Sequence, residues 1–240
     1  MQTDLFGNRR QKVNLHMHTT RSDGAHSPTT ALRIYRNEGY DAVALTDHWR
    51  FGEGGIDEGM TVLSGAEYNL AGDTGKGGVF HILSIGAERE PEIVGDDDTA
   101  DPQQVIDAIH AAGGLAILAH PAWSLNTPEQ ILRLHGFDAT EIYNSVSGVH
   151  ESRRPDSSII VDQLGARGLF LPLVADDDTH YYDYGQSGRR VARKPASCHP
   201  PRRFLCHRRT GGSSPRGRKR GDYHLLALPR GCGLFGRSVG

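Results

Sequence analysis

Short apolar runs recur along this chain, and most of them carry or directly precede a histidine or an acidic residue. The run at 42–45 leads into His48. In the same way, the run at 115–119 leads into His120. Runs of this length and composition are typical of buried β-strands, so these polar side chains are expected where a strand gives way to a loop. The fold must therefore bring several strand ends together.

Seven such runs alternate with segments of helical periodicity. The expected strands span residues 13–18, 42–46, 61–67, 79–85, 115–119, 139–143 and 169–175. The expected helices span 28–38, behind the capping candidate Ser27, and 101–112, 128–134 and 156–166. This alternation predicts an α/β fold with a parallel sheet. A closed barrel is favoured, because a barrel gathers all strand ends around one mouth, whereas an open doubly wound sheet has a single switch point.

Two pairs of candidate ligands are spaced two residues apart. Side chains at this spacing on an extended chain point to the same face, so His16 and His18 could hold one ion together. Asp178 and His180 repeat the arrangement near the other end. Asp178 is preferred over its acidic neighbours because only the D-x-H spacing puts both groups on one side, and Asp177 is then expected to point away.

The cysteine distribution restricts the kind of metal site. All three cysteines lie near the C-terminus, at Cys198, Cys206 and Cys232. A site within residues 1–188 must therefore use imidazole and carboxylate ligands, which suit zinc, manganese or iron. The same residues hold 13 lysines and arginines against 28 acids, an excess of negative charge that bound cations would partly offset.

The order and context of these candidates resemble the polymerase and histidinol phosphatase (PHP) family of metallophosphoesterases. The resemblance runs over residues 13–184, roughly the first three quarters of the chain. The segments that carry it are His16-Met17-His18, Ser22-Asp23-Gly24, Thr46-Asp47-His48, Gly65-Ala66-Glu67, His81, His120-Pro121 and Asp178-Thr179-His180.

This resemblance implies a distorted (β/α)7 barrel with a trinuclear metal centre at its mouth. It implies two to three divalent ions, and the expected residue type is present at all nine ligand positions. The implied ligand sets are His16, His18, Glu67 and Asp178; Glu67, His81 and His120; and Asp23, His48 and His180.

The reaction expected from the resemblance is hydrolysis of a small phosphomonoester, nucleotides included. Close ions lower the pKa of a bound water, so a metal-activated hydroxide would attack phosphorus without a serine or cysteine nucleophile. His180 is expected to stabilise the phosphoryl oxygens or the leaving group, and Arg21 and Arg50 to attract the phosphate. Only 38 residues separate His81 from His120, which leaves no room for an inserted lid domain and favours a small substrate.

Two other classes of function fit the same residues. A bridged hydroxide can also attack a carbonyl carbon, so a metal-dependent hydrolase of amide or ester bonds is one alternative. The other is a metal-binding module that is inactive because its C-terminal region is disrupted.

Other residues near the motifs are expected to have structural roles. Asp47 is predicted to orient the following histidine or to cap its turn. Trp49 and Trp123 are predicted to rim the pocket or to pack. The Gly-rich segments 52–59 and 72–78 lack the phosphate-loop spacing and are predicted to be loops. Surface or packing roles are expected for the histidines outside the motifs, namely His26, His110, His135 and His150.

The composition changes abruptly near residue 189. Residues 189–240 hold 14 lysines and arginines against one acid, and the hydrophobic periodicity disappears. One interpretation is a disordered basic arm that contacts nucleic-acid phosphates. The other, which the sudden appearance of cysteine favours, is out-of-frame translation of GC-rich DNA. We therefore predict a catalytic domain at 1–188 and an irregular tail at 189–240, with nucleic-acid contact expected of the tail alone.

The sequence also carries no sign of membrane association. No stretch approaches the ~18 apolar residues of a membrane span. Residues 1–10 lack the apolar core of a secretion signal. These features predict a cytoplasmic protein.

Overall fold

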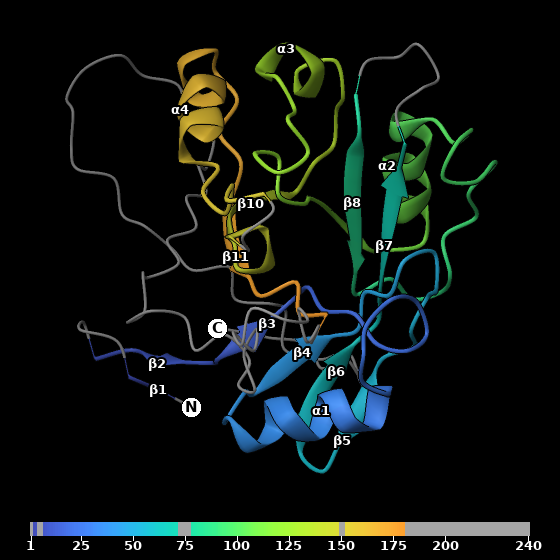
Figure 1. Cartoon of the computed structure of the whole chain (residues 1–240), viewed down its shortest axis with the longest axis vertical. Coiled ribbons are helices and arrows are strands. Elements are labelled where there is room, and N and C mark those ends of the chain that lie inside the picture. Colours follow the sequence, from blue (N-terminus) through green and yellow to red (C-terminus); the bar gives the residue numbers. More distant parts are fainter. Residues whose placement is uncertain (1, 4–6, 72–77, 149–151, 181–240) are drawn as a thin grey trace, which may run out of the picture.

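Two β-sheets form the centre of the structure, which is a computed structural model of the chain. It describes residues 2–3, 7–71, 78–148 and 152–180. One sheet has five strands in the order β11-β10-β9-β8-β7, and the other has four in the order β3-β4-β6-β5. Figure 1 shows the larger sheet above the smaller one. Helices pack against both, so the predicted α/β class is confirmed.

The strands are short and pair in both directions. The larger sheet comprises β7 (Gly65–Leu70), β8 (Phe80–Ile85), β9 (Leu115–Leu118), β10 (Ala139–Asn144) and β11 (Leu173–Asp176). The smaller sheet comprises β3 (Val13–Asn14), β4 (Ala42–Ala44), β5 (Gly55–Asp57) and β6 (Met60–Leu63). A separate antiparallel pair is formed by β1 (Gln2–Thr3) and β2 (Arg9–Arg10).

The prediction of a parallel sheet is wrong for part of the structure. β3, β4 and β6 pair in parallel, as do β9, β10 and β11. However, β8 is antiparallel to both β7 and β9, and β5 is antiparallel to β6. A parallel connection needs a crossover of about a dozen residues or more, whereas the connection from β7 to β8 is the nine residues 71–79. Because β8 runs the opposite way, its first residues lie beside the ends of its neighbours.

Several expected elements are shorter than predicted, one is divided, and one segment expected as a loop contains a strand. The strand expected at 61–67 divides at Ser64, with β6 in the smaller sheet and β7 in the larger. The segment 52–59, expected as a loop, contains β5, which pairs with β6. The chain therefore crosses from one sheet to the other at Ser64.

The two sheets approach each other at isolated backbone bridges, two of which lie at or beside predicted ligands. Met17 pairs with Thr179, and His48 pairs with Glu67. Backbone hydrogen bonds reinforce these contacts, with the His18 amide donating to the Thr179 carbonyl at 3.0 Å. Within the described residues, the strands nevertheless form separate sheets and not one continuous closed barrel. Both bridges involve or adjoin residues predicted as metal ligands.

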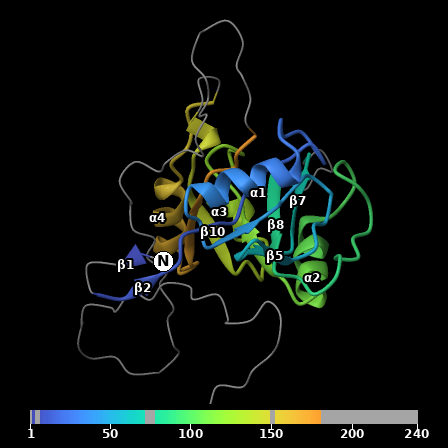
Figure 2. The same cartoon turned by 90° about the horizontal axis from the view of Figure 1, so that it is seen from below.

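The structure describes four helices, and side-chain hydrogen bonds cap the start of three of them. They are α1 (Pro28–Asn37), α2 (Pro102–Ala111), α3 (Pro128–Ile131) and α4 (Ser158–Ala166), with a 3-10 turn at Val146–Gly148. The Ser27 side chain accepts from the Thr30 amide at the start of α1, and Asp101 caps α2 in the same way. Proline follows each of these caps, where its fixed φ suits the first helical turn. Figure 2 shows α1 across the smaller sheet and α2 beside β8.

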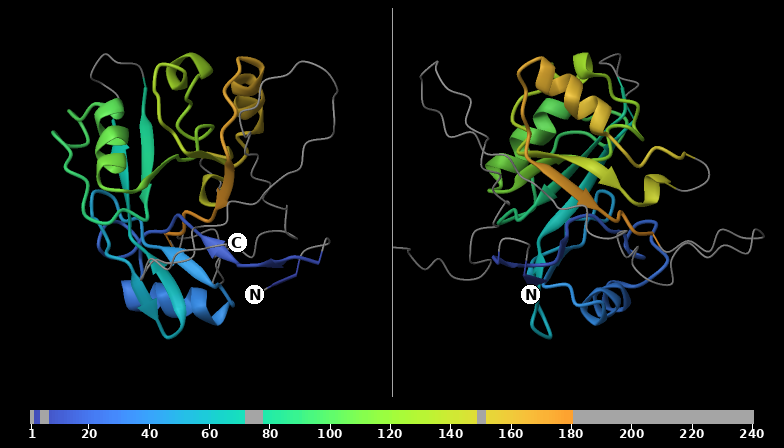
Figure 3. Two further views of the ribbon diagram at one scale, coloured as in Figure 1. Left: turned by 180° about the vertical axis from the view of Figure 1, so that it is seen from behind. Right: turned by 90° about the vertical axis from the view of Figure 1, so that its left-hand side faces the viewer.

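The apolar core lies between the helices and the sheets. Ile106 and Ile109 of α2 are fully buried against Ile82 and Leu118 of the larger sheet. Tyr35 of α1 belongs to a second cluster, beneath the smaller sheet. On the other side, α4 contacts α3 and β10 (Figure 3). These contacts fix the orientation of the strands whose ends carry the polar residues.

Part of the sequence analysis concerns residues outside the described ones. The predicted tail at 189–240 and His150 fall there, as does most of the Gly-rich segment 72–78. Across the ranges that the structure does describe, none of the helices combines the length and the apolar character that crossing a membrane requires.

Replacing Ile106 with alanine tests the packing of α2. This side chain is completely buried, so Ile106→Ala is expected to lower the free energy of unfolding by about 2–5 kcal/mol, measured by urea titration. Ile159 of α4 is 72% exposed, and Ile159→Ala should change the free energy by less than about 0.5 kcal/mol. Equal effects of the two substitutions would contradict the packing described for α2.

Candidate metal centre

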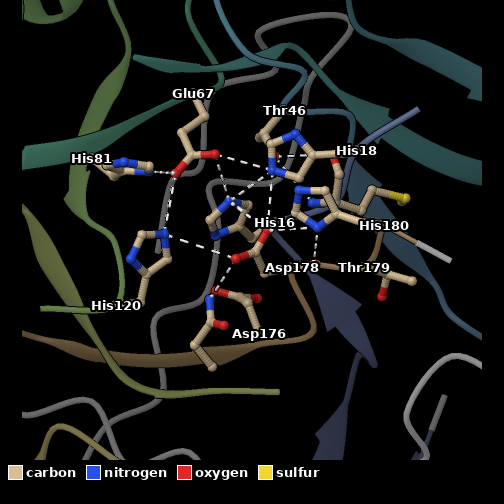
Figure 4. A network of polar contacts seen from close by, with 12 residues as sticks. His16, His18, Thr46, Glu67, His81, His120, Asp176, Asp178, Thr179 and His180 are labelled. Carbon is tan, nitrogen blue, oxygen red and sulfur yellow. Dashed lines mark hydrogen bonds and ion pairs between the residues drawn. The ribbon is translucent and has the colours of Figure 1, made fainter. Parts of the chain in front are cut away.

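The nine side chains predicted as ligands come together where the two sheets meet. They follow β3, β4, β9 and β11, or lie within β7 and at the start of β8, so the strand directions deliver them to one place. In Figure 4, imidazoles surround two central carboxylates, those of Glu67 and Asp178. The side chains form three overlapping groups that could each hold a metal ion.

The first group is central and consists of His16, His18, Glu67 and Asp178. All four residues are buried. His16 Nε2 lies 3.1 Å from Glu67 Oε2 and 3.2 Å from Asp178 Oδ1. His18 Nε2 lies 3.0 Å from each of the same two oxygens. A zinc ion with bonds of about 2.0–2.2 Å holds tetrahedral ligand atoms roughly 3.3–3.6 Å apart, so these atoms need only small shifts to surround it.

Glu67 also belongs to the second group, with His81 and His120. Its Oε1 lies 2.7 Å from His81 Nδ1 and 3.2 Å from His120 Nε2. Its Oε2 faces the first group instead. With one oxygen directed to each group, this carboxylate has the arrangement needed to bridge two ions.

The third group comprises His18, Asp23, His48 and His180. Asp23 Oδ1 lies 3.5 Å from His18 Nδ1, and Asp23 Oδ2 lies 3.4 Å from His180 Nε2. His48 Nε2 is 3.8 Å from the same Oδ2. The Asp23 side chain is 46% exposed, so this group is looser and more accessible than the first. His18 adjoins both groups, whereas the sequence assigned it to the first alone.

The buried polar atoms of the cluster fit a cation. Among the described residues, Asp178 Oδ1 and His48 Nδ1 are buried without a hydrogen-bond partner. The Nε2 atoms of His16 and His18 lie only 3.2 Å apart. Leaving buried polar atoms unsatisfied is costly, and an ion accepting their lone pairs would remove that cost. The imidazole and carboxylate donors suit zinc, manganese or iron.

The cluster shifts the pKa values of its members in opposite directions. Burial lowers the pKa of His18, but the carboxylates of Asp178 and Glu67, each 3.0 Å from its Nε2, outweigh this effect and raise that pKa to about 9. Burial lowers the pKa of His48 to about 4, and the charge of His18 adds to this effect. Burial also raises the pKa of Glu67 and of Asp178, yet the imidazoles around them hold both well below the usual range. Both carboxylates are therefore ionised.

The backbone is strained at two of the ligand positions. His120 has a φ of 25° and Asp178 a φ of 50°, which non-glycine residues rarely adopt. The extended D-x-H geometry expected from sequence is therefore wrong, because a left-handed residue directs Asp178 into the first group. Asp177 faces the other way, as expected, and accepts from the hydroxyls of Tyr35 and Tyr40 at 3.1 and 3.2 Å.

Asp47 has a different role from the one predicted. It makes no hydrogen bond to His48 in the described part of the chain. Its Oδ1 accepts from the Thr19 amide at 2.6 Å and lies 3.0 Å from the Ser22 hydroxyl. Asp47 therefore fixes the loop that leads to Asp23 and in this way supports the third group.

Sequence reasoning missed two buried polar residues of β10, Glu141 and Asn144. Glu141 is fully buried and its Oε1 lies 2.7 Å from His16 Nδ1. Asn144 Nδ2 donates to Glu141 Oε2 at 2.8 Å and to Asp178 Oδ2 at 3.2 Å. The signal that could have found Glu141 was an acidic residue within a predicted buried strand, since such a group needs a partner.

The arginines proposed to attract substrate lie at the surface. Arg50 is exposed, and Arg21 donates from Nη2 to the Phe51 carbonyl at 3.0 Å. Arg21 also lines a cavity of about 800 Å³ with Glu53 and Arg89, and none of the nine predicted ligands lines it. Among the hydrogen bonds and ion pairs of the described residues, none joins either arginine to a predicted ligand.

The two tryptophans take different positions. The ring centroid of Trp123 lies 5.4 Å from that of His81 and 5.1 Å from that of His120, so Trp123 forms a wall of the second group. Trp49 packs on Tyr68 instead, and its Nε1 donates to the Asn69 carbonyl at 3.1 Å.

Comparison with known proteins shows likeness of fold. No protein-family profile matches the chain. No curated protein matches it by sequence. An amidohydrolase from Chromobacterium violaceum, solved with bound sulfate and no metal, superposes with a TM-score of 0.52 at 16% identity over 70% of this chain and 87% of that one. A two-domain protein from Bacteroides vulgatus, containing a predicted PHP-like metal-dependent phosphoesterase, gives 0.51 at 18% identity over 71% of this chain and 52% of that one.

Metal binding should release protons and strengthen as the pH rises. Metal ligands must be unprotonated, and the raised pKa values of His16 and His18 keep both protonated in the metal-free protein at pH 7. The proton on His18 stabilises the metal-free fold below pH 6.5, and that contribution is lost as the pH rises through about 9. Calorimetry in buffers of different ionisation enthalpy should find more protons released per zinc at pH 7 than at pH 9.5. An unchanged proton count would contradict this electrostatic account.

Gly24 is the position at which a small substitution should disturb the third group. A Cβ there would lie 2.3 Å from the His18 carbonyl oxygen, so Gly24→Ala must shift the Asp23 loop. We expect zinc affinity of the third group to fall at least about tenfold, as seen by competition with a chelator. Gly55 has open space around its Cβ position, so Gly55→Ala serves as the control. Equal affinity of both variants would rule out this role of Gly24.

Proposed function

We propose that this chain is a metal-dependent phosphoesterase of the PHP type that hydrolyses a small phosphomonoester, nucleotides included. The observation that carries the proposal is the sharing of ligands. Glu67 joins the first group to the second, and His18 joins the first to the third. Closely spaced ions are the arrangement that hydrolysis of phosphate esters uses. The three overlapping ligand groups therefore fit phosphoryl chemistry better than a structural role, because a structural site encloses a single ion with four ligands.

The proposed ligands are the nine residues predicted from the sequence. His16, His18, Glu67 and Asp178 would hold one ion, Glu67 with His81 and His120 a second, and Asp23, His48 and His180 with His18 a third. Zinc, manganese or iron, when bound, would lower the pKa of a water molecule and neutralise charge on phosphoryl oxygens.

The chain's own residues define the side from which a substrate would enter. The first group is buried, whereas Asp23 is 46% exposed and the His180 side chain is 11% exposed. The phosphate would therefore meet the third group first, with His180 beside its oxygens. Trp123 would exclude water from the second group. Arg21 and Arg50 would supply positive charge around the entrance.

The proposal extends to the architecture. We infer a distorted seven-stranded barrel made of β3, β4 and β7 to β11. Two bridges support it. Met17–Thr179 joins the segments after β3 and β11, which are edge strands, and His48–Glu67 joins the segment after the inner strand β4 to the edge strand β7. The division into a catalytic domain at 1–188 and a basic tail at 189–240 remains part of the proposal.

A hydrolase of amide or ester bonds is the second candidate. The solved structure from Chromobacterium violaceum is described as an amidohydrolase, and a fold of this kind can support either chemistry. The ligand groups alone do not distinguish a phosphorus centre from a carbonyl carbon.

The purified full chain should be loaded with zinc or manganese and tested on p-nitrophenyl phosphate, p-nitrophenyl acetate and a p-nitroanilide. We expect phosphate ester hydrolysis that a chelator abolishes and added metal restores. Glu67→Gln should lower kcat/KM roughly 100-fold or more, because it removes the shared carboxylate. Glu129 is an exposed carboxylate paired with Arg167, so Glu129→Gln should leave the rate unchanged. Faster turnover of the acetate or anilide would favour the second candidate instead.

A further inference from the structure

We propose that Glu141 is a positioning residue that aligns the first and second ligand groups, while leaving the third group to a separate support. This inference rests on the proposed function, because it assigns a role toward the bound ions. Glu141 is fully buried at the middle of β10 and belongs to none of the three ligand groups. A buried carboxylate is costly unless every oxygen is matched to a donor, so its surroundings identify what it holds.

The first contact of Glu141 fixes the ring of His16. Glu141 Oε1 lies 2.7 Å from His16 Nδ1, and both side chains are completely buried. Nε2 of His16 faces Glu67 and Asp178. When the ring gives up one proton on metal binding, donation of Nδ1–H to Glu141 leaves the lone pair on Nε2, the nitrogen that faces the ion. A carboxylate behind a ligand histidine selects the ring orientation and the tautomer that metal binding needs, and it raises the basicity of the ligand.

The second oxygen of Glu141 reaches the other group. Glu141 Oε2 accepts from the His120 backbone amide at 2.8 Å. His120 has a φ of 25°, a conformation that needs support from its surroundings. This hydrogen bond holds the strained residue in place, so its Nε2 lies 3.2 Å from Glu67 Oε1.

Asn144 extends the same network to Asp178. Its amide nitrogen donates to Glu141 Oε2 at 2.8 Å and to Asp178 Oδ2 at 3.2 Å. Its oxygen accepts from the Ser147 amide at 3.0 Å, which fixes the orientation of the amide group. Asp178 Oδ2 is thereby occupied, and Oδ1 faces His16 and His18 of the first group.

A different carboxylate, that of Asp47, supports the third group. None of the hydrogen bonds and ion pairs found for Glu141 in the described ranges involves Asp23, His48 or His180. The loop carrying Asp23 is instead held by Asp47, through Thr19 and Ser22. Loss of Glu141 should therefore weaken two groups and spare the third.

Glu141→Gln removes this function with little change in shape. If the side-chain oxygen of the introduced glutamine faces the Nδ1–H of His16, its side-chain NH2 group faces the backbone N–H of His120, and two donors meet. If the amide is reversed, its nitrogen faces His16 Nδ1, and the proton moves to Nε2, which can no longer bind an ion. Either orientation disturbs one of the two groups.

The experiment is a zinc titration of the full wild-type chain, Glu141→Gln and the control Glu129→Gln, with ion content measured after dialysis. Circular dichroism must show all three proteins folded. Two binding steps of Glu141→Gln should weaken by roughly 10- to 100-fold, and one should be unchanged. Glu129→Gln should bind as the wild type does.

The outcomes separate this inference from the proposed function. A wild-type chain that binds ions, with an unchanged Glu141→Gln variant or equal weakening of all binding steps, overturns the role of Glu141 alone. A wild-type chain that binds no ion overturns the proposed function as well. Should the variant fail to fold, nitrogen NMR of the zinc-loaded wild type still tests the inference, because His16 must carry its proton on Nδ1. A proton on Nε2 would overturn it.

Discussion

The buried carboxylate of Glu67 is the group on which the rest of the arrangement depends. It is 1% exposed, and imidazoles from five different positions lie within 3.3 Å of its two oxygens, namely those of His16, His18, His48, His81 and His120. A lone carboxylate would not be stable at this depth, because burial disfavours its charged form. The imidazoles reverse that effect, and they reach Glu67 from the ends of β3, β4 and β9 and from the start of β8. The environment of Glu67 therefore depends on the order of the strands, on the crossing of the chain between the two sheets and on the charges of the surrounding side chains.

The same site explains several features that cost stability. His120 and Asp178 adopt left-handed backbone conformations, and buried atoms of His48 and Asp178 lack hydrogen-bond partners. Such features persist where the surroundings enforce them and are common at functional sites. Here these conformations are held by polar residues that contact the ligand residues but belong to none of the three ligand groups. Glu141 and Asn144 support the first two groups, and Asp47 supports the third, so the ligand atoms are held close together before any cation arrives.

The sequence predicted the elements well and their directions less well. Spacing placed α1 and α2 to within a residue or two, and the Ser27 cap marked the start of α1, because a capping side chain followed by proline leaves little freedom at a helix start. The antiparallel course of β8 was not predicted, since an apolar run has the same pattern in either direction. Its reversal has a direct effect on the site, because it places His81 at the start of a strand beside the ends of β7 and β9.

By itself, the sequence determined which residue types were available and that they fall at strand ends, because apolar runs and the polar residues after them are local features. It therefore gave the nine candidate ligands and the α/β class. Only the tertiary structure decided that His18 adjoins two groups, that Asp47 holds a loop, and that Glu141 stands behind His16. Each of these roles joins residues far apart in the chain. Such distances depend on how the two sheets pack, which no local pattern encodes.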